Sequence, residues 1–139
     1  MKFWDSSAIV GLLVEEKATL PLRAIMSGDT NQTVWCLTAV EIASALARRV
    51  RDGLLPNGEE AFRSSWRIFA ERWQEVTSVE RVRSRALRLL GVHALRAPDA
   101  LQLAAALVAC DDRPEALPFV CLDDRLRDAA RREGFSVLP

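Results

Sequence analysis

One apolar stretch decides how the rest of the chain is interpreted: LRAPDALQLAAAL, residues 95–107. Pro98 suits the first turn of a helix, because the N–H that proline lacks is left unpaired there in any case. Asp99 follows it, next to the free N–H groups and the positive end of the helix dipole. Helical spacing puts Gln102 and Ala106 on the side of Asp99, and it predicts a broad buried face made by Leu101, Ala104, Ala105 and Val108. We therefore expect a central helix with one carboxylate at its entrance.

Length and composition indicate one folded domain over residues 1–139. Half of the residues are hydrophobic and 27% are charged, as in ordinary globular proteins. The 19 Lys and Arg balance the 19 Asp and Glu, which argues against a long basic surface for nucleic acid and favours only a local contact. Apart from Lys2 and Lys17, all the basic residues are Arg, whose planar guanidinium is the better fork for phosphate.

The three cysteines, Cys36, Cys110 and Cys121, form no CxxC pair and are expected to be buried free thiols. With His93 as the only histidine, a zinc site of the Cys/His type is not expected. Asp5 interrupts the N-terminal region, and the apolar run at 8–14 is too short to span a membrane. These features predict a cytoplasmic protein without a membrane contact.

Strands and helices alternate along the sequence. Predicted strands cover 2–4, 33–37, 76–77, 119–122 and 135–138, and predicted helices other than the central one cover 6–14, 18–26, 38–52, 59–73, 79–90 and 124–133. Ser6 or Ser7 is expected to cap the first helix, Asp123 the last, and Thr38 the third, where Glu41 has the spacing of a capping box. This alternation predicts an α/β fold with a parallel sheet covered by helices on both faces.

Four acids occupy the positions where ligands bind in such folds, near the carboxyl ends of the strands. Asp5 and Asp123 each follow a predicted strand, Glu41 lies within a turn of another, and Asp99 stands at the entrance of the central helix. Each acid by itself also fits an ordinary capping or first-turn role. Spacing alone leaves open whether the four converge on one point.

If they converge, their mutual repulsion favours a hard divalent cation with oxygen ligands, such as magnesium. Such an ion lowers the pKa of a bound water and positions that water for attack on a phosphodiester. A site with acids and no histidine suits phosphate chemistry better than acyl transfer.

Several stretches together resemble the PIN domain family, and within it the VapC toxins of toxin–antitoxin pairs. The stretches are FWDSSA (3–8), LTAVE (37–41), LRAPDALQLA (95–104), FVCLDDRL (119–126) and AARREGFSVL (129–138). They cover the chain from end to end and stand in the order of the family. The resemblance implies a PIN-like (Rossmann-like) three-layer domain: a short parallel sheet flanked by helices, with an appended helical hairpin.

The resemblance also implies an endoribonuclease that depends on Mg²⁺ or Mn²⁺. Asp5, Glu41, Asp99 and Asp123 match the catalytic acids of the family, and Asp5, Asp99 and Asp123 are its expected metal ligands. Supporting positions are matched by Ser7 (less closely Ser6), by Gln102, and by Asp124 as a shifted candidate for the fourth acid. One departure is Cys121, which stands where the family often has Ser or Thr.

Arg48 lies two helical turns beyond Glu41 on the same face, where it could bind substrate phosphate or simply be a solvated helix end. Arg96 could also contact phosphate, but its neighbours indicate packing and it is not included among the site residues; His93 is assigned to a helix end.

An aromatic stripe is formed by Phe62, Trp66, Phe69 and Trp73 at helical spacing. Its default interpretation is core packing, and as part of an appended hairpin it could also form a partner groove or dimer face. The family resemblance implies a homodimer whose partner is a VapB-like antitoxin.

Three other functions are compatible with parts of the pattern. A phospho-acceptor receiver domain needs a Lys after a late strand, and neither Lys2 nor Lys17 is placed there. A non-catalytic, helix-rich binding or dimerisation module is left if the acids are only caps. A structure-specific DNA nuclease of related fold is disfavoured by the neutral charge and small size.

Overall fold

The computed structural model describes residues 1–14, 17–55 and 73–139. Its sheet has five strands: β1 (Lys2–Trp4), β2 (Gln32–Trp35), β3 (Trp73–Val76), β4 (Phe119–Val120) and β5 (Val137–Leu138). Their order is β3-β2-β1-β4-β5 and every pairing is parallel, which confirms the predicted sheet.

The reversal of strand order at β1 positions the site. From β1 the chain first adds β2 and β3 on one side, and later adds β4 and β5 on the other. Phe3 of β1 is therefore paired with Thr33 of β2 and with Phe119 of β4. In open parallel sheets ligands bind at such a switch point, outside the carboxyl ends of the strands. The residues that follow β1 and β4 lie at this switch point.

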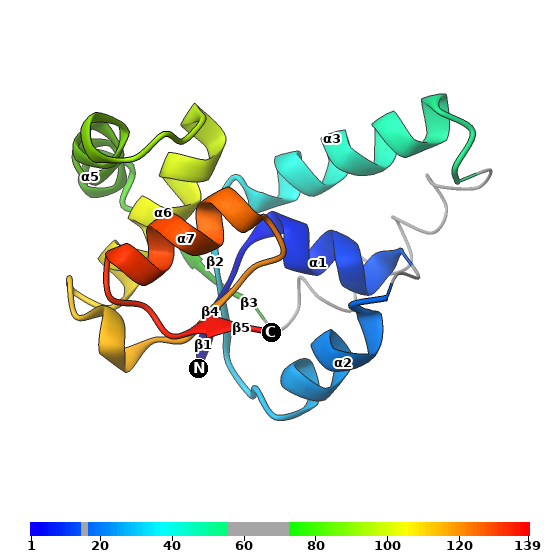
Figure 1. The fold of residues 1–139 in the computed structure, drawn as a ribbon, viewed down its shortest axis with the longest axis horizontal. Helices are drawn as coiled ribbons and strands as arrows, with labels where there is room; N and C mark the ends of the chain where they lie inside the picture. The colour runs from blue at the N-terminus through cyan, green and yellow to red at the C-terminus, as the bar shows by residue number, and fades with distance from the viewer. Residues whose placement is uncertain (15–16, 56–72) are drawn as a thin grey trace.

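Helices cover both faces of the sheet (Figure 1). They are α1 (Ser6–Leu13), α2 (Thr19–Ser27), α3 (Thr38–Arg51), α5 (Val79–Val92), α6 (Ala97–Ala109) and α7 (Asp124–Arg132), with a short 3₁₀ turn, η1, at Pro114–Ala116. Alternate residues of each strand point to opposite faces. Phe3 and Phe119 pack with α5, α6 and α7, whereas Trp4 and Val120 pack with α1, α2 and α3.

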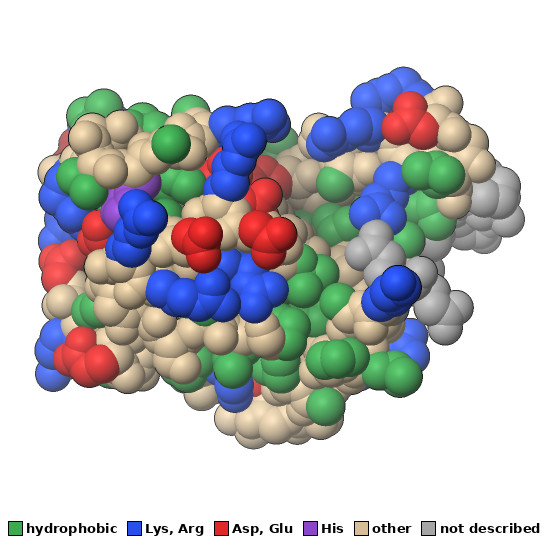
Figure 2. All heavy atoms as spheres, viewed as in Figure 1, with side chains coloured by type: hydrophobic (Ala, Val, Ile, Leu, Met, Phe, Trp, Pro, Cys, Tyr) green, Lys and Arg blue, Asp and Glu red, His purple; other side chains and the backbone are tan. Residues whose placement is uncertain are grey.

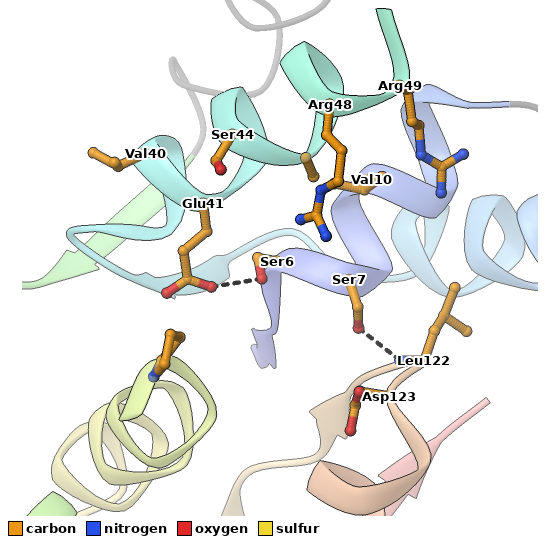
Figure 3. A pocket seen from close by; sticks show the side chains of 12 residues that line it. Ser6, Ser7, Val10, Val40, Glu41, Ser44, Arg48, Arg49, Leu122 and Asp123 are labelled. Carbon is orange, nitrogen blue, oxygen red and sulfur yellow. Dashed lines mark hydrogen bonds between the residues drawn. The ribbon is translucent and has the colours of Figure 1, made fainter. Parts of the chain in front are cut away.

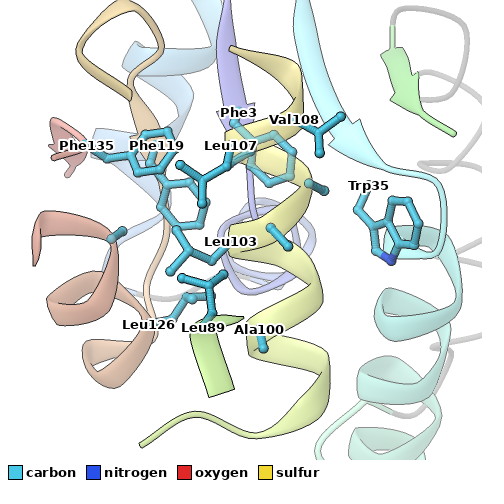
Figure 4. Close-up of a cluster of buried hydrophobic side chains, with 14 of the residues drawn as sticks. Phe3, Trp35, Leu89, Ala100, Leu103, Leu107, Val108, Phe119, Leu126 and Phe135 are labelled. Carbon is cyan, nitrogen blue, oxygen red and sulfur yellow. The ribbon is translucent and has the colours of Figure 1, made fainter. Parts of the chain in front are cut away.

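Helix α6 is buried on nearly all sides: the predicted buried face is confirmed at Ala104, Ala105 and Val108, and burial extends beyond it. Ala106 and Gln102 are buried, whereas Leu101, assigned to the core face, is only partly covered. The small side chains let α5 and the sheet approach α6 closely, and Leu103 and Leu107 fill the space against Phe119 (Figure 4). The carboxylate at its entrance is therefore mounted on a rigid element.

Two of the predicted caps were also wrong. Asp5, not Ser6 or Ser7, is the N-cap of α1, and its side chain accepts from the Ser7 N–H at 2.9 Å. Thr38 begins α3 as a buried residue bonded to Gln102, and Glu41 does not bond back to form a capping box. The side chains of Thr38 and Glu41 instead bond to residues of other helices, and local spacing in the sequence does not reveal such contacts.

The remaining element predictions agree except at boundaries. Helix α5 continues through Gly91, where a stop was predicted, and the last two strands are shorter than expected. Of the predicted helix 59–73, residues 59–72 lie outside the described residues, and so do Phe62, Trp66 and Phe69; Trp73 begins β3. The three cysteines are free thiols, two of them buried and Cys36 half-buried. Within the described ranges, no helix is both long and apolar enough to cross a membrane.

Candidate active site

Asp5 lies at the carboxyl end of β1 and is almost wholly buried, with 3% of its surface exposed. Its Oδ2 accepts from the Ser7 N–H, from the Ser7 hydroxyl and from the Cys121 thiol, whose sulfur is 3.4 Å away. Burial raises the pKa of Asp5 above its ordinary value, the bonds from Ser7 and Cys121 partly oppose this, and the charge of Asp99 raises it further. Asp5 is thus held in a fixed position, and the charge of Asp99 acts on its pKa.

Glu41 reaches the same region from the first turn of α3. Its Oε2 accepts from Ser6 Oγ at 2.7 Å and from Gln102 Nε2 at 3.1 Å. Burial raises the pKa of Glu41, against the effect of these two bonds, and the charges of Asp5 and Asp99 raise it further. The carboxylate of Glu41 is held in place from two different helices, α1 and α6.

Gln102 is the link between Glu41 and the core. Only 1% of this residue is exposed, and its Nε2 also donates to Thr38 Oγ1 at 3.0 Å. A buried amide needs such partners, because an unpaired polar group in the interior is costly. The contact with Glu41 agrees with the supporting position expected for Gln102.

Asp99 stands in the first turn of α6, where its Oδ2 accepts from the Arg96 N–H at 3.2 Å. Its pKa is raised, chiefly by burial and also by the charge of Asp123, while Arg96 and Arg125 act in the opposite direction. Asp99 therefore lies between the buried acids and two arginines.

Asp123 follows β4 and is the N-cap of α7, as predicted, with its Oδ1 accepting from the Leu126 N–H at 2.8 Å. Asp124, next to it in the first turn of α7, is exposed, and so is Asp123. Asp123 borders both cavities of the site, whereas Asp124 borders only the smaller one. The charge of Asp123 also raises the pKa of Asp99.

Ser7 and Cys121 join the two central strands beneath the acids. Ser7 Oγ accepts from the Leu122 N–H at 2.9 Å and also contacts Asp5, so it ties the start of α1 to the end of β4. Cys121 is fully buried and its sulfur accepts from the Asp123 N–H at 3.3 Å. Burial, together with the charge of Asp5, raises the pKa of this thiol far above its ordinary range, which keeps it protonated. Cys121 thereby bridges Asp5 and Asp123.

Two cavities open at this edge of the sheet. The larger, about 640 Å³, is lined by Ser6, Ser7, Glu41 and Asp123 together with the two arginines of α3, Arg48 and Arg49 (Figure 3). The smaller, about 420 Å³, is lined by Arg96, Asp99, Leu122, Asp123, Asp124 and Arg125. Arg48 lines the larger cavity and is exposed, so both interpretations of this residue, a phosphate contact and a solvated helix end, stay open.

Two arginines of this region were not selected from the sequence. Arg96 was considered for phosphate and set aside in favour of packing, but it is exposed and lines the smaller cavity, and Arg125 was not considered. The available signal was their position, since each stands within three residues of a candidate acid at a helix entrance.

The chemistry of the donors fits a hard divalent cation. The pKa values of Asp5, Glu41 and Asp99 are raised by burial and by neighbouring carboxylates, and a bound cation would relieve both effects. As the side chains stand, no three Asp, Glu, Cys or His residues of the described chain lie close enough together to hold an ion. Mg²⁺ is commonly held by one or two carboxylates and keeps several waters, so a preformed group of three is not required for such an ion.

Comparison with known proteins shows which family the chain resembles. The family model of the PIN domain matches residues 2–132. Ribonuclease VapC45 of Mycobacterium tuberculosis (strain CDC 1551 / Oshkosh) and Ribonuclease VapC49 of the same species (strain ATCC 25618 / H37Rv) are each 31% identical over 138 residues, which cover 99% of this chain and 94% of theirs. Among solved structures, FitAcB from Neisseria gonorrhoeae has a TM-score of 0.64 at 16% identity and covers 100% of this chain and 97% of that one, a likeness that shows the fold alone.

Three observations agree with one another: the parallel sheet with its switch point at β1, the acids at the carboxyl ends of β1 and β4, and the match along nearly the whole chain. The chain belongs to the PIN domain family, and its curated relatives within that family are VapC proteins.

Proposed function

We propose that this chain is a metal-dependent endoribonuclease, the toxin of a type II, VapBC-like toxin–antitoxin pair, built as a single PIN domain over residues 1–139. One observation carries the proposal. Carboxylates from separate segments of the chain stand at the strand ends and helix starts around the switch point, and each of Asp5, Glu41 and Asp99 has its pKa raised by at least one of the others or by Asp123. Relatives named ribonucleases support RNA as the substrate.

In this proposal Asp5, Asp99 and Asp123 hold the ion, with Asp124 as the alternative to Asp123. Mg²⁺ or Mn²⁺, when bound, supplies the charge that acidifies a water and stabilises the leaving oxygen of the phosphodiester. The oxygen donors suit either ion.

The protein's own side chains orient the reaction. Ser7 fixes Asp5, and Gln102 with Ser6 fixes Glu41. The raised pKa of Glu41 suits a carboxylate that accepts a proton from the attacking water. Arg48, at the wall of the larger cavity, provides a guanidinium for a substrate phosphate.

The partners proposed are a VapB-like antitoxin and a second copy of the chain. The larger cavity combines an apolar wall, made by Val10, Val40 and Leu122, with the arginines of α3, and this mixture suits a peptide segment. Val40 is 64% exposed at its rim. We place the protein in the cytoplasm, where RNA is available and thiols such as Cys110 and Cys121 stay reduced.

The test is cleavage of a mixed-sequence single-stranded RNA by purified protein in Mg²⁺ or Mn²⁺. The wild type is expected to cut within the strand, to stop when the metal is chelated, and to lose at least about 100-fold in rate on Asp99→Asn. Arg23→Gln, an exposed change on α2 away from the site, is the matched control and should cut like the wild type.

Four results would contradict the proposal. Asp99→Asn cutting at the wild-type rate would show that the carboxylates do not carry the reaction. Cutting of branched duplex DNA with no cutting of RNA would favour the DNA nuclease, and tight partner binding without any cleavage would favour the binding module. In cells, unaffected growth on production of the wild type without an antitoxin would argue against a toxin.

A further inference from the structure

A third cavity lies beside the proposed active site and is used by none of the steps above. It measures about 470 Å³ and is lined by His93, Ala94, Leu95, Arg125, Asp128, Ala129 and Arg132. Arg125 also lines the smaller cavity of the active site, where it acts on the pKa of Asp99. The two cavities are therefore neighbours that share one guanidinium.

The two arginine side chains of this cavity are available to a ligand. Arg125 and Arg132 are both exposed, and neither forms an ion pair with any residue of the described chain. They stand seven residues apart on α7, which puts them on the same face about 10 Å apart along the helix axis. Blue side chains gather around red carboxylates on this face, over α7 and the start of α6 (Figure 2).

The other charged groups of the cavity are already paired. Asp128 accepts from Arg131 at 3.1 Å, which offsets its charge. The His93 side chain is only 6% exposed, and its Nε2 lies 2.7 Å from Glu133 Oε1, so the ring is held as a fixed wall. What remains unpaired in the cavity is positive.

We propose that the cavity bounded by His93, Arg125 and Arg132 binds a backbone phosphate of the single-stranded RNA on one side of the bond that is cut. The inference rests on the proposed function and adds to it the direction of the strand: from the acids, past Arg96 and Arg125, towards Arg132. Arginine forks bind phosphate oxygens in pairs, and such contacts position a strand without reading its bases. The neutral overall charge of the chain agrees with a short local contact of this kind.

The experiment measures RNA binding apart from cleavage. A fluorescein-labelled single-stranded oligouridylate of about ten nucleotides is titrated with the wild type, Arg132→Gln, Arg132→Lys and Arg23→Gln in EDTA, at several KCl concentrations. Arg132→Gln is expected to weaken binding about threefold, and to reduce the slope of log Kd against log[KCl] by about 0.7, which is one phosphate contact on a single strand. Arg132→Lys should keep the slope, and Arg23→Gln should match the wild type in both.

Substrate length and steady-state kinetics sharpen the test. A dinucleotide, too short to reach from the acids to Arg132, should bind the wild type and Arg132→Gln equally. In cleavage assays with the oligouridylate and Mg²⁺ or Mn²⁺, Arg132→Gln should raise KM and leave kcat unchanged, whereas Asp99→Asn should lower kcat. Melting temperatures of all variants check that each is folded.

The inference is overturned if Arg132→Gln binds the long RNA with the affinity and salt slope of Arg23→Gln. It is also overturned if Arg132→Gln weakens the complex with a co-produced antitoxin and leaves RNA binding intact, because the cavity would then serve a protein. Failure of the proposed function looks different: the salt slope would still fall in Arg132→Gln, but no cleavage would depend on Asp99.

Discussion

Two groups of acids in this molecule are treated in opposite ways. On the surface formed by α5 and the loops after α6 and α7, carboxylates meet arginines: Arg81 donates to Asp111 at 2.9 Å, and Arg85 donates to Asp112 from Nε at 3.0 Å. The hydrogen bonds from Arg85 hold the pKa of Asp112 below its ordinary value. Glu133 likewise has a lowered pKa, because Arg88 and His93 both contact it.

At the switch point of the sheet, Asp5 and Glu41 have no arginine or histidine partner among the described residues. Within the part of the chain that the structure describes, Asp5 and Glu41 accept hydrogen bonds only from Ser, Cys and Gln side chains and from the backbone, and their pKa values are raised by burial. A buried carboxylate without a cation costs folding free energy. The acids that pair with arginine link two elements of the fold. Asp5 and Glu41, which do not, lower the stability of the fold, and residues that do so are often found at functional sites.

The sharpest test of this contrast is a pair of matched substitutions, Asp5→Asn and Asp112→Asn. Asp5→Asn is expected to reduce RNA cleavage by at least about 100-fold, because it removes one charge from the metal-binding set. Its melting temperature should be no lower than that of the wild type, because the amide oxygen keeps the bonds from Ser7 and a buried charge is lost. Asp112→Asn should keep its cleavage rate. Equal loss of cleavage in both variants, with initial rates as the measurement, would remove the contrast.

The next largest effect is expected at Gln102, which connects the acids to the core. Gln102→Met keeps the side-chain volume but removes the hydrogen bonds that Gln102 donates to Thr38 and Glu41, so the free energy of unfolding should fall by about 1–3 kcal/mol. Cleavage should fall as well, because Glu41 is then held only by Ser6. Leu101→Met, one residue earlier and only partly buried, is the control and should change stability by less than about 1.5 kcal/mol. Urea unfolding measures the stability of both variants. An equal loss of unfolding free energy in Leu101→Met and Gln102→Met would contradict the role of the Gln102 amide.

The two groups should also respond to pH with opposite signs. For Asp5, Glu41 and Asp99 the folded pKa lies above the unfolded one, so as pH falls through the folded pKa the native state takes up protons first and stability rises. For Asp112 and Glu133 the folded pKa lies below the ordinary 3.8 and 4.5, so their contribution is present above those values and is lost as pH falls through the folded pKa.

Unfolding free energy measured by urea should therefore increase from neutral to mildly acidic pH and then decrease in stronger acid. Asp99→Asn should flatten the rise, and Asp112→Asn should lessen the fall. A rise of the same size in Asp99→Asn and in the wild type would show that the buried acids are not its cause.

The smallest effect is expected from the exposed pairs. Arg85→Gln should lower the free energy of unfolding by no more than about 1 kcal/mol, because water screens both partners. The loss should shrink further in 1 M salt. Thermal melts at two salt concentrations are sufficient, and a loss that does not depend on salt would indicate packing by the Arg85 stem instead.

Much of the fold could be predicted because it follows from local pattern. The β-branched and aromatic runs mark β1, β2 and β4, and their alternation with helical segments indicates a parallel sheet. The cap at Asp123 was predicted correctly, since an acid after a strand and before a helix has that role in most contexts. The cap at Thr38 was predicted wrongly, because Gln102, 64 residues away, binds its hydroxyl.

The candidate site divides in the same way. The positions of the acids along the chain were sufficient to nominate Asp5, Glu41, Asp99 and Asp123, since strand ends and helix starts share one edge of such a sheet. The surroundings of each acid were not predictable: that Ser6 serves Glu41 while Ser7 serves Asp5, or that Cys121 donates to Asp5. The cavity at Arg132 had no signal in sequence, because its lining comes from the end of α5 and from α7, far apart along the chain.

By itself the sequence determined the order of the elements and the edge of the sheet at which the acids stand, because hydrophobic period, helix entrances and strand ends are local properties of the chain. Only the tertiary structure decided which charges are paired and which are left alone. A carboxylate's pKa and its partners depend on burial and on neighbours brought from other segments, so Asp112 and Asp99, the same residue type in one sequence, became a member of a surface ion pair and a half-buried acid of the proposed site.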